Sequence, residues 1–184
     1  MAILSNTDIR QTFNYLSTLD NILQKEIKLV RGNKSYLDKI VPEEVVREYS
    51  QKLSTALDFV DNLSNTSYES SVIVLVATFE KIVFAKYKTS FGSIKGVVRI
   101  NAQKPLDYYA MREKFVDGSI DKLHSIIELI KEHIDPELVA SLKAIKEQRD
   151  YFAHGKRFGL SPSITLTLEQ IAMVLDKVII EIEK

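Results

Sequence analysis

The sequence has no cysteine and no tryptophan, and only 6 glycines and 4 prolines among its 184 residues. Without cysteine, the chain has no disulfides, no thiolate metal sites and no cysteine nucleophile. This absence fits a reducing, intracellular setting. The segment Met1–Arg10 shows no apolar run behind a basic start, which a secretory signal would need. We therefore expect a cytoplasmic protein without such a signal.

Long hydrophobic runs and an excess charge are lacking too. The longest apolar run, residues 72–79, is broken by Thr78 and closed by Glu80 and Lys81, so it is too short to cross a bilayer. Twenty-five basic residues balance 25 acidic ones, so net charge neither favours nor excludes nucleic acid as a partner. Hydrophobic residues make up 45% of the chain, which at this length predicts one core and a single domain over residues 1–184.

The scarcity of glycine and proline, with apolar residues spaced three and four apart, predicts an all-α fold, a bundle of about six to seven helices. Residues 90–105 are the least regular stretch, with Gly92, Gly96 and Pro105, and a β-like fragment at 97–100 fits there. We expect helices over Thr7–Leu29, from Pro42 until a break at 62–67, and over Ser70–Lys88, Asp107–Phe115, Ile120–His133, Pro136–Gly155 and Leu168–Glu183.

The last expected helix has apolar residues on two sides. Its main stripe is Ile171, Leu175, Val178 and Ile182, while Met173 and Ile180 form a second ridge. Two interpretations stay open: a helix buried on two sides of the monomer, or a helix that forms part of a dimer interface.

The helix expected over Pro136–Gly155 contains the residues most suited to chemistry. Its apolar face includes Leu142 and Ile145, and Arg149 completes that stripe. A guanidinium on an apolar stripe is costly unless it is paired or lines a polar pocket. His154 follows five residues later, about 140° away on an ideal helix. The two side chains reach one site only if the helix end distorts or a second subunit supplies a partner.

The segment Arg149–Gly155, with the sequence RDYFAHG, resembles the Arg-x4-6-His motif of the HEPN family. A polar residue, Asp150, directly follows the arginine, and His-Gly closes the motif. An earlier helix carries Glu80 within an apolar run, and a further helix follows the motif. The resemblance covers the chain from about Ser70 onward and is less clear over residues 1–66.

This resemblance implies a HEPN-type helical bundle and a metal-independent endoribonuclease of the toxin–antitoxin or phage-defence type. It further implies a homodimer whose two motifs flank one cleft, with RNA as substrate and an antitoxin or a nucleotidyltransferase as a protein partner. The residues it carries over are Arg149, Asp150 and His154. Histidine moves protons near neutral pH, and arginine stabilises a charged phosphorane-like transition state with bidentate geometry.

Other interpretations of the same residues remain open. Arg149 is also explained as a paired core arginine, and His154 as a C-cap favoured by the helix dipole. The corresponding functions are a non-catalytic HEPN-like binding or scaffolding module, or a structural bundle that carries the motif by chance.

A basic region without acidic residues lies between Glu80 and Asp107, and more positive charge follows the motif. Such a region binds phosphates, and its interleaved rings, Phe84 and Tyr87, would stack on bases if exposed. The alternative is a solvated segment with its rings in the core. The candidate RNA-binding residues are Lys86, Lys88, Lys95, Arg99, Lys156 and Arg157.

Glu80 lies on the flank of an apolar helix face, where an unpaired carboxylate is expensive. A salt bridge to Arg149 would satisfy both groups, whereas the alternative is a side chain that reaches water from the edge of the stripe. The histidines His124 and His133 and their neighbouring carboxylates match no known metal-ligand spacing. No cofactor motif is present, so we expect neither a metal nor a cofactor.

Overall fold

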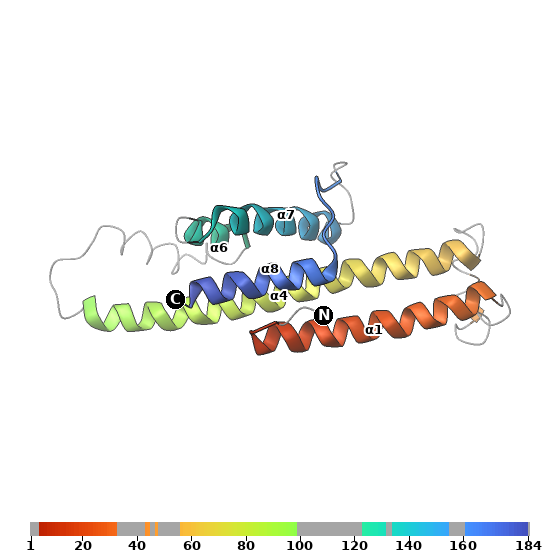
Figure 1. The fold of residues 1–184 in the computed structure, drawn as a ribbon, viewed down its shortest axis with the longest axis horizontal. Helices are drawn as coiled ribbons and strands as arrows, with labels where there is room; N and C mark the ends of the chain where they lie inside the picture. The colour runs from red at the N-terminus through yellow and green to blue at the C-terminus, as the bar shows by residue number, and fades with distance from the viewer. Residues whose placement is uncertain are drawn as a thin grey trace.

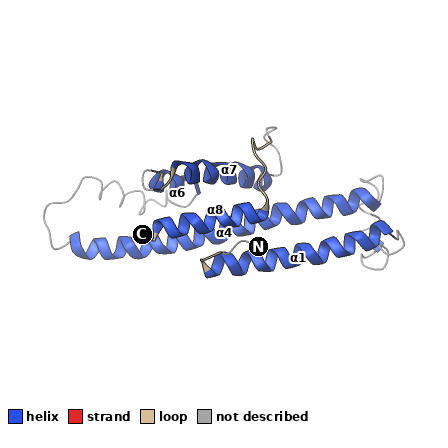
Figure 2. Ribbon diagram, in the orientation of Figure 1, coloured by secondary structure: helices blue, strands red, loops and turns tan. Residues whose placement is uncertain are grey.

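The computed structural model describes residues 4–32, 43–44, 47, 56–98, 123–131, 134–154 and 161–183. Every regular element in these ranges is a helix, which confirms the all-α fold (Figures 1 and 2). The predicted helix over Asp107–Phe115 lies outside the described residues. The elements are α1 (Thr7–Gly32), α4 (Ala56–Val98), α6 (Leu123–Ile130), α7 (Pro136–Ala153) and α8 (Leu168–Ile182).

The 43-residue helix α4 forms the axis of the molecule, with α1 on one side and α6 and α7 on the other (Figure 1). At 1.5 Å per residue it extends over about 65 Å. Helix α1 packs antiparallel to it. Near one end of the pair, Arg31 Nη2 lies 2.5 Å from Asp61 Oδ1, and near the other the hydroxyls of Thr12 and Thr78 are 3.5 Å apart.

The expected break at residues 62–67 is wrong, because α4 continues through it. Asparagine and serine are weak helix formers when their side chains compete for backbone hydrogen bonds. Here Asn62 Nδ2 donates to the Asp58 carbonyl one turn earlier, at 2.8 Å. Ser64 Oγ accepts from Gln24 Nε2 of α1, at 3.0 Å. The polar stretch is thus stabilised by contacts compatible with a helix.

The same helix also covers part of the stretch expected to be irregular. Residues 90–98 are helical, Gly92 and Gly96 among them, so a β-like fragment at 97–100 is wrong for its first two residues. A glycine inside a helix costs about 1 kcal/mol relative to alanine, which a long helix tolerates. The remaining residues of that stretch, 99–105, lie outside the described ranges.

The hydrophobic core lies where α4, α6, α7 and α8 meet, and α1 adds Ile9 and Leu16 to it. Each helix contributes the apolar face that its three- and four-residue spacing predicts. Burial of these faces fixes the position of α7, which carries the motif. The fully buried large side chains include Leu75, Phe79, Leu123, Ile126, Ile127, Leu142, Ile145, Ile171, Leu175 and Ile179.

Helix α8 begins at a capping box, in which the Thr167 and Gln170 side chains each accept from the other residue's backbone N–H. Most of its predicted main stripe is buried. On the second ridge Met173 is exposed and Ile180 is half-buried. The monomer therefore does not bury this ridge fully. Among the described helices, none has the length and apolar character needed to cross a membrane.

The start of α1 is tied to α8 through Asp176, which is buried. Its carboxylate accepts from the backbone N–H groups of Ser5, at 2.9 Å, and Asn6, at 2.6 Å. Asn6 Oδ1 in turn accepts from the N–H of Ile9, at 3.1 Å, as an N-cap residue does. Nothing in the sequence pattern identified Asp176, because its partners are about 170 residues away.

Candidate functional site

Helix α7 forms where the sequence predicts it. Asp135 is its N-cap, and its Oδ1 accepts from the Glu137 N–H at 2.7 Å. Pro136 occupies the first turn, where a missing N–H costs nothing. The helix ends at Ala153, and His154 is its C-cap, with its N–H donating to the Asp150 carbonyl at 3.0 Å. The motif therefore spans the last turn of α7.

The buried stripe of α7 is rotated from the predicted one. Val139, Leu142, Ile145 and Gln148 are its buried residues, and Gln148 is 0% exposed. Arg149 lies one position further round the helix, and its side chain keeps 22% of its surface exposed. The prediction that Arg149 occupies the centre of the stripe is thus wrong: Gln148 does, and Arg149 lies on its flank.

Gln148 was missed by the sequence analysis, although its amide organises the end of α7. Its Nε2 donates to the Tyr68 hydroxyl at 2.5 Å and to the Leu166 carbonyl at 3.1 Å. Its Oε1 accepts from the Leu166 N–H at 2.8 Å. The Tyr68 hydroxyl also donates to the Leu166 carbonyl. These bonds compensate the burial of the amide and join α7 to α4 and to the segment before α8.

Aromatic packing supports the same junction. The Phe152 ring, inside the motif, meets the Tyr68 ring edge-on with centroids 5.8 Å apart, a favourable geometry. Burial raises the pKa of the Tyr68 hydroxyl, and the hydrogen bond from Gln148 partly offsets that rise. The hydroxyl therefore stays protonated and available as a donor at neutral pH.

Arg149 is held by two carboxylates. Its Nη2 lies 2.6 Å from Glu80 Oε1, which confirms the predicted ion pair, and its Nη1 lies 2.9 Å from Asp150 Oδ1. The Glu80 side chain is 20% exposed. Its Oε1 also accepts from the Leu123 N–H, at 3.1 Å. Because Leu123 begins α6, Glu80 links three helices and adds a negative charge at a helix N-terminus.

The charges continue along α7. Asp150 Oδ2 lies 2.6 Å from Lys146 Nζ, so Glu80, Arg149, Asp150 and Lys146 form a chain of alternating charges. Two positive and two negative groups leave this chain with no net charge. The guanidinium donates one hydrogen bond to Glu80 and forms an ion pair with Asp150. Because it has five N–H groups, donors remain for a further acceptor such as a phosphate oxygen.

His154 lies at the exposed end of the same helix. Its backbone continues the helical hydrogen bonding, with φ −94° and ψ 13°. This position fits the C-cap interpretation, and it also leaves the residue accessible to a ligand. The structure thus brings Arg149 and Asp150 into contact and places His154 one turn further along, on the solvent side.

The predicted RNA-binding residues are not brought together among the described side chains. Lys86 forms an ion pair with Glu183 at the end of α8, a counter-charge that lies 97 residues away in sequence. The side chains of Lys88 and Lys95, and all of Arg99, Lys156 and Arg157, lie outside the described residues. The basic surface therefore stays a prediction for five of its six members.

The rings between these lysines pack inward where the structure describes them. Phe84 and Tyr87 are half-buried and contact the hydrophobic core, so stacking of these two rings on bases is not supported. Burial also raises the pKa of Tyr87. Within the described ranges no three His, Asp or Glu side chains gather closely enough to hold a metal ion.

A shallow groove of about 490 Å³ runs between α7 and α8, away from the motif end of α7. Met173, one of the two residues of the second ridge of α8, lines it together with Leu138 and Val174. The rim carries the carboxylates of Asp135, Glu137 and Glu181.

Comparisons with family models, with curated proteins and with solved structures give no match for this chain. The likeness to HEPN proteins therefore depends on the residues of the motif and their positions on α7.

Proposed function

We propose that this protein is an endoribonuclease of HEPN type that cleaves RNA by acid–base chemistry without a metal, in a toxin or phage-defence role. The observation that carries the proposal is the fixed position of Arg149. Glu80 and Asp150 orient its guanidinium at the end of α7, and His154 follows at the exposed helix end. Metal-free phosphodiester cleavage requires an oriented cation and an accessible histidine, and the end of α7 supplies one of each.

In the proposed reaction the ribose 2′-hydroxyl attacks the adjacent phosphorus, so that an O2′–P bond forms and the P–O5′ bond breaks. His154 accepts the proton of the attacking hydroxyl and delivers it to the 5′-oxygen as the P–O5′ bond breaks. Arg149 stabilises the charge that develops on the phosphorane oxygens. The products are a 2′,3′-cyclic phosphate and a 5′-hydroxyl.

A second copy of the chain has a defined role in this proposal. Because Arg149 and His154 diverge by about 140° on an ideal helix, one phosphodiester contacts both most simply when two motifs face one cleft. The ion pair between Glu80 and Arg149 need not break for this, because the guanidinium has five N–H groups and only two contacts with carboxylates among the described residues.

A second candidate function is favoured by the charge balance around Arg149. The two carboxylates that hold the guanidinium also neutralise it, and Lys146 and Asp150 balance each other. Such a chain of ion pairs is equally suited to holding helices together in a non-catalytic binding or scaffolding module. An antitoxin or a nucleotidyltransferase is then the expected partner.

Incubation of purified protein with mixed cellular RNA in EDTA tests the proposal. We expect the wild type to cleave, and His154→Ala to lose about 10²–10⁴-fold in rate, the usual contribution of general acid–base catalysis. His124→Ala is the matched control, because His124 is an exposed histidine on α6 outside the motif. Failure of the wild type to cleave diverse RNAs would favour the binding module.

A further inference from the structure

Helix α1 carries an apolar stripe that the monomer leaves uncovered. Tyr15, Leu19, Ile22 and Leu29 are 65%, 43%, 53% and 50% exposed. They are four of the eight large hydrophobic side chains that are exposed in the described part of the chain. Scattered exposed residues need no explanation, but several on one helix face mark an interaction surface.

The spacing of the stripe is that of a helix-pairing seam. Steps of four and three residues from Tyr15 lead to Leu19, Ile22, Glu26 and Leu29, which is the alternation of a coiled-coil heptad. At 100° per residue the four apolar members fall within a sector of about 80°. The stripe is about 21 Å long.

This stripe is distinct from the face that α1 buries inside the monomer. That face is made by Ile9, Leu16, Ile27 and Val30, and it is centred about 100° away round the helix. Helix α1 therefore has one apolar face for its own fold and a second, adjacent one without a partner among the described residues.

We propose that the stripe pairs with the same stripe of a second copy of this chain, antiparallel, with the two-fold axis near Ile22. Ile22 is the central position of the stripe, so a two-fold axis there places Tyr15 beside the partner's Leu29. Such self-complementarity is what an isologous interface requires. The seam has the length of about four helical turns.

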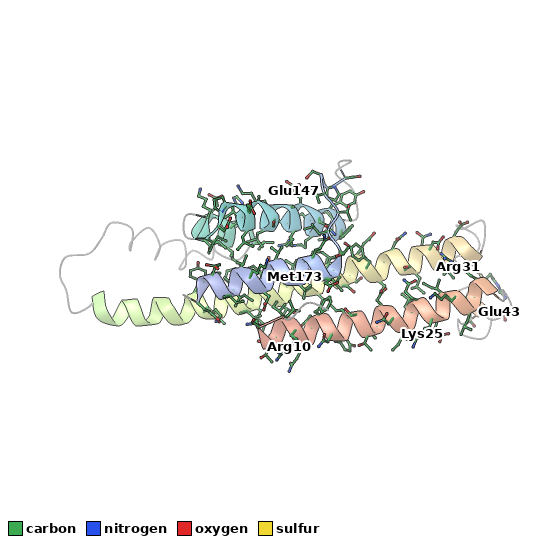
Figure 3. The ribbon with its side chains drawn as sticks, in the orientation of Figure 1. Arg10, Lys25, Arg31, Glu43, Glu147 and Met173 are labelled. Atoms are coloured by element: carbon green, nitrogen blue, oxygen red, sulfur yellow. The ribbon has the colours of Figure 1, made fainter. Side chains whose placement is uncertain are left out.

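Charge favours this orientation. Glu26 lies within the stripe, and Lys25 is its neighbour in sequence. Figure 3 shows Lys25 well separated from Arg10 along the helix. A parallel pair would bring Glu26 beside the partner's Glu26 within the seam. The antiparallel pair avoids this contact of like charges and also opposes the two helix dipoles.

Pairing through α1 is separate from the pairing of motifs proposed above. Helix α1 lies on the side of α4 opposite to α7 (Figure 1), so an α1 pair leaves the motif uncovered. Dimerisation through α1 can therefore occur with or without dimerisation at the motif. A test of the α1 interface does not depend on ribonuclease activity.

Single-cysteine cross-linking tests the proposal directly, because the chain has no cysteine. Ile22→Cys, treated with a short bismaleimide, is expected to give covalent dimers. Tyr15→Cys alone is expected to give none, because two copies of that position lie about 21 Å apart along the antiparallel pair. A mixture of Tyr15→Cys and Leu29→Cys is expected to cross-link. Val74→Cys, at a similarly exposed position on α4, is the control.

Sedimentation velocity provides the second readout. The wild type is expected to sediment as a dimer or a larger species. Ile22→Lys is expected to abolish the dimerisation through α1, whereas Val74→Lys is expected to sediment like the wild type. Circular dichroism checks that both variants fold. The proposal is overturned if Ile22→Cys cross-links no more than the Val74→Cys control, or if Tyr15→Cys alone cross-links as well as the mixture. A wild-type monomer at high concentration would overturn it too.

Discussion

Glu80 Oε1 lies 2.6 Å from Arg149 Nη2 and at the same time accepts from the Leu123 N–H. One carboxylate oxygen thereby joins α4, α6 and α7, across 69 residues between the two charged partners. This bond sets the direction of the guanidinium, so the stability of the fold and the geometry of the site depend on the same residue.

Replacing Glu80 should therefore destabilise the fold. Glu80→Ala leaves the Arg149 guanidinium with one carboxylate and the Leu123 N–H without an acceptor. We expect a loss of about 2–3 kcal/mol in the free energy of unfolding, below the cost for a fully buried pair because both side chains keep contact with water. Urea denaturation measures it. Glu147→Ala, an exposed carboxylate of α7, should change stability by less than about 0.5 kcal/mol.

Replacing Asp150 by asparagine should increase the affinity for RNA, and it should destabilise the fold less than Glu80→Ala does. Its carboxylate pairs with Arg149 and repels any phosphate that approaches the guanidinium. Asp150→Asn keeps an acceptor oxygen for Arg149 but removes this charge. We expect RNA to bind about threefold more tightly, from a change near 0.7 kcal/mol for charges about 6 Å apart in water. Fluorescence anisotropy at fixed salt measures the Kd.

Glu147→Gln is the matched control for that experiment, because it removes one negative charge from the same helix. Glu147 is exposed, and its described side-chain contact is a hydrogen bond from the Ser163 hydroxyl. An equal gain in affinity for both variants would show that total charge, and not the Arg149 site, determines binding.

Gln148 should prove as important for stability as the charged residues. Gln148→Ala leaves a cavity and removes the partners of the Tyr68 hydroxyl and the Leu166 backbone. We expect a loss of about 2–4 kcal/mol, measured by thermal or urea unfolding. Gln11→Ala, an exposed glutamine on α1, should have little effect. If Gln148→Ala also had little effect, the hydrogen-bond network would not hold the end of α7.

The raised pKa of Tyr68 predicts a dependence of stability on alkaline pH. Burial raises this pKa in the folded state above its ordinary value of 10.0. The sign follows from linkage: the contribution to stability is complete below the unfolded pKa and is lost as the pH rises through the folded one. As the pH rises above 10.0, the wild type should lose stability more steeply than Tyr68→Phe. Parallel pH profiles would contradict this assignment.

The sequence predicted the parts of the structure that depend on local patterns. The start of α7 at Pro136 and the cost of leaving Glu80 unpaired both follow from residues near each other in the chain. The sequence did not identify Gln148 as the buried residue, because the helical periodicity of α7 fits an apolar stripe that includes residue 148 as well as one that includes residue 149. Only the helices that cover α7 determine that rotation.

Long-range partners explain the remaining differences. The polar stretch after Asp61 remains helical partly because Ser64 accepts a bond from Gln24, on another helix. The sequence around Lys86 contains no acidic residue after Glu80 and so predicts no partner for it, yet Lys86 forms an ion pair with Glu183. Neither contact can be predicted from a local sequence pattern, because the two partners lie far apart in the chain.

One pair of substrates tests whether Arg149 and His154 cleave RNA through the ribose 2′-hydroxyl. A short RNA cleaved at a single position is compared in EDTA with the same RNA carrying 2′-deoxyribose at that position. We predict that the wild type cleaves only the first, leaving a 2′,3′-cyclic phosphate, and that His154→Ala cleaves neither at a comparable rate. Cleavage of the 2′-deoxy substrate, or equal cleavage by His154→Ala, would contradict the account.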